Sequence, residues 1–112
     1  MTPRIVSSMT VSALLRMAQR ESGFGAVIAR GDESAGAIII VLAERGRRVR
    51  AMERVLKPDG NYAWGDSIAA GQNEADLDKF LEKRRRSDPD LWIVELDTAS
   101  AERFAAEIIA LD

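Results

Sequence analysis

Hydrophobic residues recur along this chain with two different periods. The three- and four-residue spacing of one helix face joins Val11, Leu14, Leu15 and Ala18. This stripe predicts an amphipathic helix over residues 9–21. Ser8 or Thr10 is placed to cap its start, and Gly23 is placed to end it. Residues 37–43, by contrast, are apolar and largely β-branched, which is typical of a central strand covered on both faces.

Turn residues on either side of this central strand indicate its neighbours. The polar loop 31–36 is bracketed by glycines and predicts a hairpin between strand 24–30 and strand 37–43. The Arg-Gly pair at 45–46 permits a second tight turn, which leads into strand 48–56. We therefore expect consecutive antiparallel strands in this part of the chain.

The strand over residues 48–56 alternates imperfectly, because Glu53 falls on its apolar face. A bulge explains this pattern, and so does an edge position. The Lys-Pro-Asp-Gly sequence at 57–60 then predicts a turn, because proline presets φ and glycine accepts a positive φ. A short fourth strand follows, with Tyr62 and Trp64 on one face.

The C-terminal half predicts two helices with a strand between them. Asn73 and Asp76 resemble a capping box at the start of a helix that continues to about Arg86. Its apolar stripe consists of Leu77, Phe80 and Leu81. The Asp-Pro-Asp sequence at 88–90 ends this helix. Residues 91–96 then form an apolar strand, which we expect to be inserted into the sheet.

Thr98 is placed to cap a last helix. The apolar face of that helix consists of Ala101, Phe104, Ala105, Ile108 and Ile109. The predicted order is therefore α-β-β-β-β-α-β-α, in one domain over residues 1–112. Helices should pack on a mostly antiparallel sheet, which is an α+β fold.

The 112 residues include neither cysteine nor histidine. This excludes disulfides, thiol nucleophiles, imidazole bases and zinc sites built on those ligands. No apolar run is long enough to span a bilayer, and the N-terminus lacks the apolar core of a signal peptide. We expect a cytoplasmic protein without a metal or cofactor. The formal net charge is −2, so any attraction to nucleic acid must be local.

Basic residues gather in two segments of the chain. Residues 45–57 carry six cations against one acid, and residues 83–86 are all basic. If the two segments meet, they would form a phosphate-binding face with aromatic rings available for base stacking. The alternative is a solvated strand face together with a helix end whose charges complement the helix dipole. The candidate binding residues are Arg48, Arg50, Arg54, Tyr62, Trp64, Arg84 and Arg85.

Further candidates surround Trp92. Asp88 and Asp90 could bind Mg²⁺ or act as an acid–base pair. The alternative is structural: the two carboxylates end the helix and pair with Arg84 or Arg85, while Trp92 fills the core. We favour the structural interpretation, because no catalytic constellation accompanies these residues.

Three segments stand out together: Val-Ser-Ala-Leu-Leu-Arg at 11–16, Arg-Gly-Asp-Glu-Ser-Ala-Gly-Ala at 30–37, and residues 84–95 with the sequence Asp-Pro-Asp-Leu-Trp inside them. In combination they resemble a small family of uncharacterised alphaproteobacterial proteins, a domain of unknown function of about this length. The Asp-Pro-Asp-Leu-Trp sequence is the most specific part. The resemblance implies a bacterial, cytoplasmic, stand-alone domain, and it implies no activity, ligand or catalytic residue.

The element order also resembles the layout of acyl-CoA N-acetyltransferases. The pyrophosphate-binding loop of that layout would fall at residues 69–76, which lack its Gln/Arg-x-x-Gly-x-Gly/Ala spacing. We therefore expect a non-enzymatic binding or interaction module, with a homodimer formed through an exposed edge strand. Two alternatives stay open. One is binding of nucleic acid or another phosphate ligand through the arginine-rich strand. The other is a small acyl- or phosphoryl-group enzyme that uses Asp88, Asp90 or Glu95 together with arginine side chains.

Overall fold

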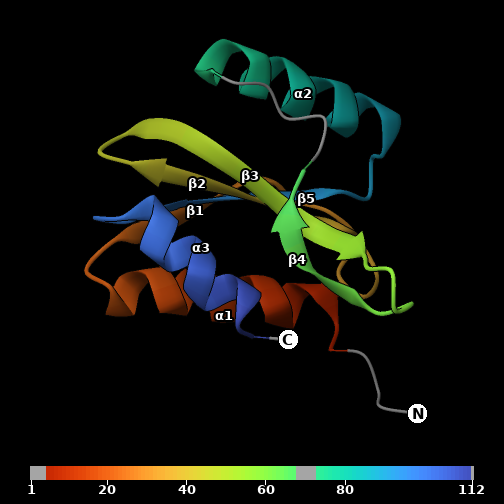
Figure 1. The fold of residues 1–112 in the computed structure, drawn as a ribbon. Coiled ribbons are helices and arrows are strands. Elements are labelled where there is room, and N and C mark those ends of the chain that lie inside the picture. The colour runs from red at the N-terminus through yellow and green to blue at the C-terminus, as the bar shows by residue number, and fades with distance from the viewer. Residues whose placement is uncertain (1–4, 68–72, 112) are drawn as a thin grey trace.

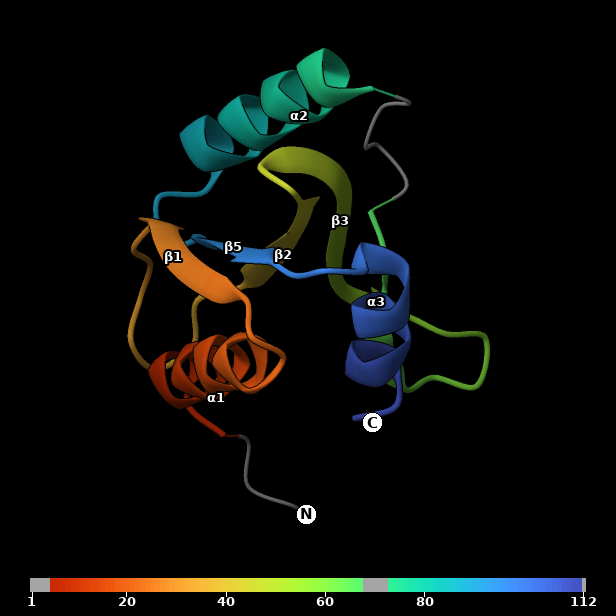
Figure 2. The same cartoon turned by 90° about the vertical axis from the view of Figure 1, so that its left-hand side faces the viewer.

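The protein consists of three layers in a computed structural model that describes residues 5–67 and 73–111. Its helices are α1 (Ser7–Arg20), α2 (Glu74–Ser87) and α3 (Ala101–Ile109). Its strands are β1 (Phe24–Ala29), β2 (Ile38–Glu44), β3 (Arg47–Leu56), β4 (Tyr62–Asp66) and β5 (Trp92–Asp97). The sheet is the middle layer, with α2 on one face and α1 and α3 on the other (Figures 1 and 2). The α+β class and the predicted element order are confirmed.

The last strand of the chain lies inside the sheet. The strand order is β1-β5-β2-β3-β4, and β5 runs antiparallel to β1 but parallel to β2. Insertion of this strand into the sheet is therefore confirmed. The predicted hairpin between residues 24–30 and 37–43 is wrong, because β5 separates β1 from β2. A turn pattern cannot reveal an intervening strand that comes much later in the chain.

The helix α1 begins earlier than predicted, and no side chain caps it. The main-chain amides of Ser7 and Ser8 donate instead to the carbonyl oxygens of Ser34 and Glu33, at 3.2 and 2.9 Å. The prediction that Ser8 or Thr10 caps this helix is therefore wrong. The acceptors come from the loop between β1 and β2, so no local pattern could identify them.

The C-terminal end of α1 is a Schellman motif. Ser22 adopts the left-handed conformation with φ of 61°, and the amide of Gly23 donates to the carbonyl oxygen of Ala18 at 2.9 Å. Gly23 therefore belongs to the end of the helix, as predicted. It has a further role, because a Cβ atom at this position would collide with the carbonyl oxygen of Asp97 on β5.

The strand β3 contains a bulge, but Glu53 is not its cause. The register against β2 shifts between Leu42 and Ala43, which leaves Val49 as the extra residue. Because of this extra residue, Arg48 lies on the face of the sheet that α2 covers, whereas regular alternation would place it on the opposite face. Glu53 lies on that same face in regular alternation, so the predicted irregularity exists at a different place.

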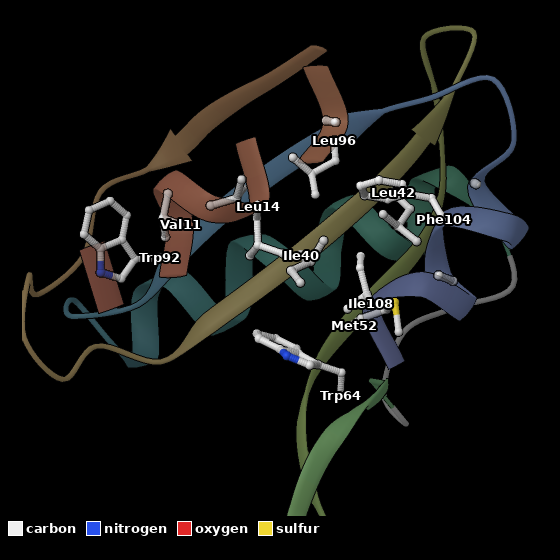
Figure 3. Packing of buried hydrophobic residues seen from close by; sticks show 14 residues of the cluster. Val11, Leu14, Ile40, Leu42, Met52, Trp64, Trp92, Leu96, Phe104 and Ile108 are labelled. Carbon is white, nitrogen blue, oxygen red and sulfur yellow. The ribbon is translucent and has the colours of Figure 1, made fainter. Parts of the chain in front are cut away.

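Two hydrophobic clusters hold the three layers together. The larger cluster lies between the sheet and the α1–α3 layer (Figure 3) and includes Val11, Leu14, Ile40, Leu42, Met52, Trp64, Trp92, Leu96, Phe104 and Ile108. The smaller cluster lies between the sheet and α2 and includes Ile39, Val41, Ala51, Leu77, Leu81, Leu91 and Ile93. Residues 39–43 of β2 are fully buried and contribute to both layers, as the sequence predicts for a central strand.

The caps of α2 and α3 bear on two further predictions. The side chain of Asn73 accepts the amide of Asp76 at 2.9 Å, so the predicted start of α2 is confirmed. The start of α3 is capped by Ser100, whose hydroxyl accepts the amide of Arg103 at 3.3 Å. The prediction of Thr98 as this cap is wrong. Thr98 directly follows β5 and is buried, two residues before the capping position.

Candidate functional site

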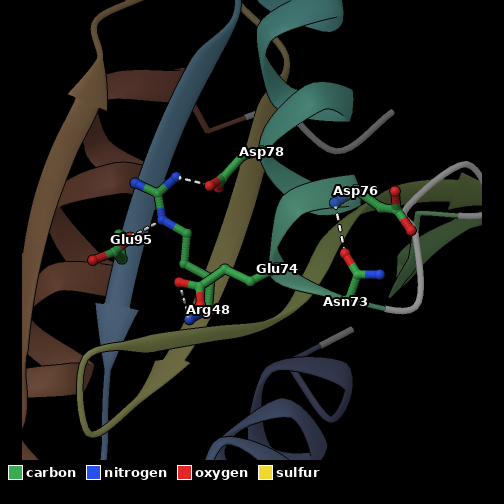
Figure 4. Close-up of polar contacts among 6 residues, drawn as sticks. All are labelled: Arg48, Asn73, Glu74, Asp76, Asp78 and Glu95. Atoms are coloured by element: carbon green, nitrogen blue, oxygen red, sulfur yellow. Dashed lines mark hydrogen bonds and ion pairs between the residues drawn. The ribbon is translucent and has the colours of Figure 1, made fainter.

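Arg48 lies at the centre of a polar network between the sheet and α2 (Figure 4). Its Nε donates to Oε1 of Glu95 on β5 at 2.5 Å, and its Nη1 donates to Oδ1 of Asp78 on α2 at 2.9 Å. The main-chain amide of Arg48 donates to Oε1 of Glu74 at 3.3 Å. One residue of β3 therefore links β5 to two successive turns of α2.

The side chain of Arg48 is partly buried, with 26% of it exposed. Burial alone would lower the pKa of Arg48. The hydrogen bonds and negative charges of Glu95 and Asp78 outweigh burial, and together they raise the pKa of Arg48 above its ordinary value. The group is therefore always charged, and its Nε and Nη1 are occupied within the protein.

The two basic segments meet at Glu53. Nη1 of Arg84 on α2 lies 2.8 and 3.0 Å from the two carboxylate oxygens of Glu53 on β3. The hydroxyl of Ser67 donates to the same carboxylate at 2.5 Å. The meeting point is therefore a neutralised ion pair and not a shared positive face. Arg85 is exposed on the following position of α2.

Arg50 and Arg54 lie on the other face of the sheet from Arg48. Their cross-strand neighbours belong to the cluster beneath α1 and α3. Arg50 forms an ion pair with Asp66 on β4. The guanidinium carbon of Arg54 lies 5.0 Å from the ring centroid of Trp64, which is cation–π geometry. The three predicted arginines of β3 are thus divided between two faces.

The two aromatic residues predicted for base stacking share a face, as expected, but differ in exposure. Trp64 is buried in the larger core cluster. Tyr62 is exposed at the end of the β3–β4 hairpin, opposite Leu56. The structure therefore does not place both rings beside one group of arginines.

The residues around Trp92 form a joint between two distant segments. The buried indole donates through Nε1 to the carbonyl oxygen of Asp32 at 2.7 Å, and the amide of Asp32 donates to the carbonyl oxygen of Asp90 at 3.0 Å. The carboxylate of Asp88 accepts the amide of Asp90 at 3.0 Å. The guanidinium of Arg30 lies 5.4 Å from the Trp92 ring centroid. These contacts shape a turn and fill the core.

The predicted ion pairs of Asp88 or Asp90 with Arg84 or Arg85 are wrong. Arg84 pairs with Glu53 instead, and the carboxylate of Asp88 accepts a hydrogen bond from the main-chain amide of Asp90. Within residues 5–67 and 73–111, no three acidic side chains converge closely enough to hold a metal ion. The joint therefore offers a structural role for both aspartates.

A hollow of about 610 Å³ opens beside β3. It is bounded by the β2–β3 turn, the outer edge of β3 and the first turn of α2. Strand β4 pairs only with residues 52–56 of β3, so residues 47–51 have no partner on that side among the described strands. The arginines that line the hollow are Arg45, Arg47, Arg48 and Arg50.

Residues 5–106 of the sequence match the family model of DUF1491, which is described as a protein of unknown function. The chain belongs to the DUF1491 family. A crystal structure of a DUF1491 protein from Caulobacter crescentus is similar, with a TM-score of 0.78, 29% identity, and 88% of this chain and 92% of that chain covered. A solution structure of a protein from A. tumefaciens has a TM-score of 0.71, 32% identity, and coverage of 88% and 89%. No curated protein matches the sequence.

Membership of DUF1491 confirms the resemblance to an uncharacterised family with alphaproteobacterial relatives. That the Asp-Pro-Asp-Leu-Trp sequence marks this family stays a prediction. Residues 68–72, which include the first half of the segment compared with an acetyltransferase loop, lie outside the described residues. In the part of the chain that the structure describes, no helix has the length and apolar character to cross a bilayer.

Sequence reasoning missed the acidic partners of the arginines in this DUF1491 protein. Asp66, Asp78 and Glu95 each neutralise an arginine of β3. Neither Asp66 nor Asp78 was a candidate, and Glu95 was one only as a group of the enzyme alternative. One signal was available for α2, where Glu74 and Asp78 stand four residues apart and therefore face the same way. The sequence could not show that this face meets Arg48, because the bulge in β3 decides it.

Proposed function

We propose that this DUF1491 protein is a non-enzymatic interaction module that pairs with a second copy through β1. The observation that carries the proposal is that β1 is an edge strand of six residues, Phe-Gly-Ala-Val-Ile-Ala, without a charged side chain or a proline. Natural edge strands usually carry such residues, which oppose pairing with another chain. An edge without them suits pairing with a further strand.

The exposure of β1 supports the same proposal. Phe24, Val27 and Ile28 are apolar, yet 59%, 41% and 40% of their surfaces are exposed. The pairing with β5 is regular from Phe24 to Val27 and shifts only before Ala29. The bulge is therefore confined to one end of the strand, and most of the edge keeps regular strand geometry. A neighbouring strand would remove these side chains from water.

A second copy is the occupant that the charges favour. In an antiparallel pair around a two-fold axis, each strand opposes an identical strand running the other way. Like charges that face each other across such a pair are destabilising. β1 has none, so two copies can meet without this penalty and join two five-stranded sheets into one.

The candidate arginines of β3 already interact with other groups of the protein, and this favours an interaction module over an enzyme. The arginines that the sequence singled out on β3 are engaged with Glu95, Asp78, Asp66 and the Trp64 ring. The chain has no histidine or cysteine to serve as a general base or a thiol nucleophile. A fold without cysteine also suits the cytoplasm, because it does not depend on oxidation.

The test is the mass in solution of three proteins, measured by size-exclusion chromatography with light scattering. We expect the wild type to have twice the chain mass of 12.3 kDa. Val27→Lys places a charge on β1 and should give a monomer. Val49→Lys is the matched control, because Val49 is also an exposed strand valine but lies in the bulge of β3.

A wild type that stays monomeric at high concentration would contradict the proposal. Equal dissociation of both lysine variants would also contradict it, since the effect would then not depend on β1. Thermal unfolding of each variant shows whether the monomer is folded, and we expect both variants to melt cooperatively.

A further inference from the structure

We propose that the hollow beside β3 binds a small molecule carrying a phosphoryl group, and that Arg45 and Arg47 hold this group. The site lies at the β2–β3 turn, away from the edge strand β1. It does not depend on self-pairing, so each proposal can fail without the other.

The first argument is the availability of the arginines. Arg48 and Arg50 line the hollow, but their guanidinium groups form ion pairs with acids of the protein. Within residues 5–67 and 73–111, Arg45 and Arg47 form no ion pair or side-chain hydrogen bond, and both are exposed. Their planar donors therefore remain free, and the guanidinium fork matches the oxygens of a phosphoryl group.

The acids that line the hollow are already engaged. Oε1 of Glu44 accepts the main-chain amide of Ala101 at 2.9 Å. Oε1 of Glu74 accepts the main-chain amide of Arg48. Neither carboxylate pairs with a free arginine, and each fixes the start of a helix or the edge of a strand. Neither acid holds Arg45 or Arg47 in an ion pair, so the two guanidinium groups stay available to a ligand.

The second argument is the rigidity of the turn that carries these arginines. Arg45 and Gly46 have φ of 53° and 80°, the left-handed pair of a two-residue hairpin turn. The amide of Gly46 donates to Oδ2 of Asp97 on β5 at 2.8 Å, which ties the turn to the next strand. Arg47 follows directly as the first residue of β3. A fixed backbone lowers the entropy cost of ordering both side chains around a ligand.

The third argument concerns the class of ligand. The volume falls within the range of about 300–1,000 Å³ that is usual for small-molecule sites. The apolar part of the lining is Val49, Ala51 and Leu77, without an aromatic ring among the described lining residues. Single-stranded nucleic acid is usually held by stacking of its bases on aromatic rings, which this described lining does not offer. A compact phosphorylated molecule therefore fits the hollow better than nucleic acid.

The experiment uses inorganic pyrophosphate as the probe, at constant ionic strength, with ¹⁵N–¹H NMR on the wild-type protein. We expect saturable shifts of the amides around residues 45–50 and 74–77. The double variant Arg45→Gln/Arg47→Gln should bind at least about tenfold more weakly, because two charge-assisted contacts are lost. The matched control is Arg16→Gln/Arg20→Gln, which removes two exposed arginines of α1 and should leave binding unchanged.

Three results would overturn the proposal. The first is the absence of a saturable shift. The second is equal weakening by both double variants, which would indicate general charge attraction. The third is tighter binding of a single-stranded RNA oligomer with a steep salt dependence, which would make the surface a nucleic-acid site. The mass measurement of the preceding section is independent of all three, so failure here leaves self-pairing untouched.

Discussion

The indole of Trp92 donates a hydrogen bond to the carbonyl oxygen of Asp32 at 2.7 Å, across 60 residues of sequence. This contact holds the β1–β2 loop against the start of β5. The same loop accepts the first amides of α1, through the carbonyl oxygens of Ser34 and Glu33. The three segments that resemble the family thus belong to elements that meet at one joint. We infer that the joint fixes the inserted position of β5.

Trp92→Phe tests the hydrogen bond of this joint. Phenylalanine keeps most of the apolar burial but lacks the donor, which leaves the Asp32 carbonyl oxygen with only the longer hydrogen bond from the amide of Gly36, at 3.3 Å. We expect the free energy of unfolding to fall by about 1–2 kcal/mol. Urea unfolding measures the change, and a loss below about 0.5 kcal/mol would show that the bond contributes little.

Gly36→Ala tests how closely the loop crosses the start of β5. An added Cβ atom would collide with the carbonyl oxygen of Asp90, which is main chain and cannot rotate away. We expect a loss of at least about 2 kcal/mol in thermal or urea unfolding. The control is Gly65→Ala, whose Cβ would lie 3.0 Å from Cγ2 of the Val55 side chain. That side chain can adjust, so a comparable loss in both variants would contradict the explanation.

Arg48→Met tests the network between the sheet and α2. It leaves Glu95 half-buried without its cation, and we expect a loss of about 1–3 kcal/mol. The double variant Arg48→Met/Glu95→Leu should recover most of this loss, because both charges are then removed. Arg47→Met, at the exposed neighbouring position, should stay within about 0.5 kcal/mol of the wild type. Equal losses in the single and double variants would contradict the pairing.

The Asp59 carboxylate gives a prediction of pH dependence. The amide of Asn61 donates to it at 2.9 Å, and this hydrogen bond together with the charge of Lys57 lowers the pKa of Asp59 below its ordinary value. A lowered pKa in the folded state means that this stabilisation is complete above about pH 4 and is lost as the pH falls through the folded-state pKa.

An NMR titration of side-chain carboxyl groups measures this pKa directly. We expect Asp59 to titrate below about 3.9, the value of an unperturbed aspartate. An ordinary value would mean that the turn over residues 57–60 does not hold the amide of Asn61 against the carboxylate in solution.

Local sequence patterns predicted the helices and strands of this fold better than the contacts between them. The burial of β2 and the capping of α2 by Asn73 depend on neighbouring residues, and both are confirmed. The position of β5 and the start of α1 depend on the β1–β2 loop, which no spacing rule connects to them. The same holds for the site. Arg48 was a candidate, but its face was decided by the bulge at Val49 and its role by Glu95 and Asp78.

The position of β5 also determines when the protein can become complete during synthesis. Strands β2, β3 and β4 are consecutive antiparallel neighbours, so they can pair as soon as each is made. β1 is made before all of them, yet among the described strands it pairs only with β5, residues 92–97. Every nascent chain short of that point carries an unpaired, uncharged strand and an open side of β2. The strand that closes the sheet is therefore made after the other four, and until then β1 and one side of β2 lack the neighbour that would cover their main-chain polar groups.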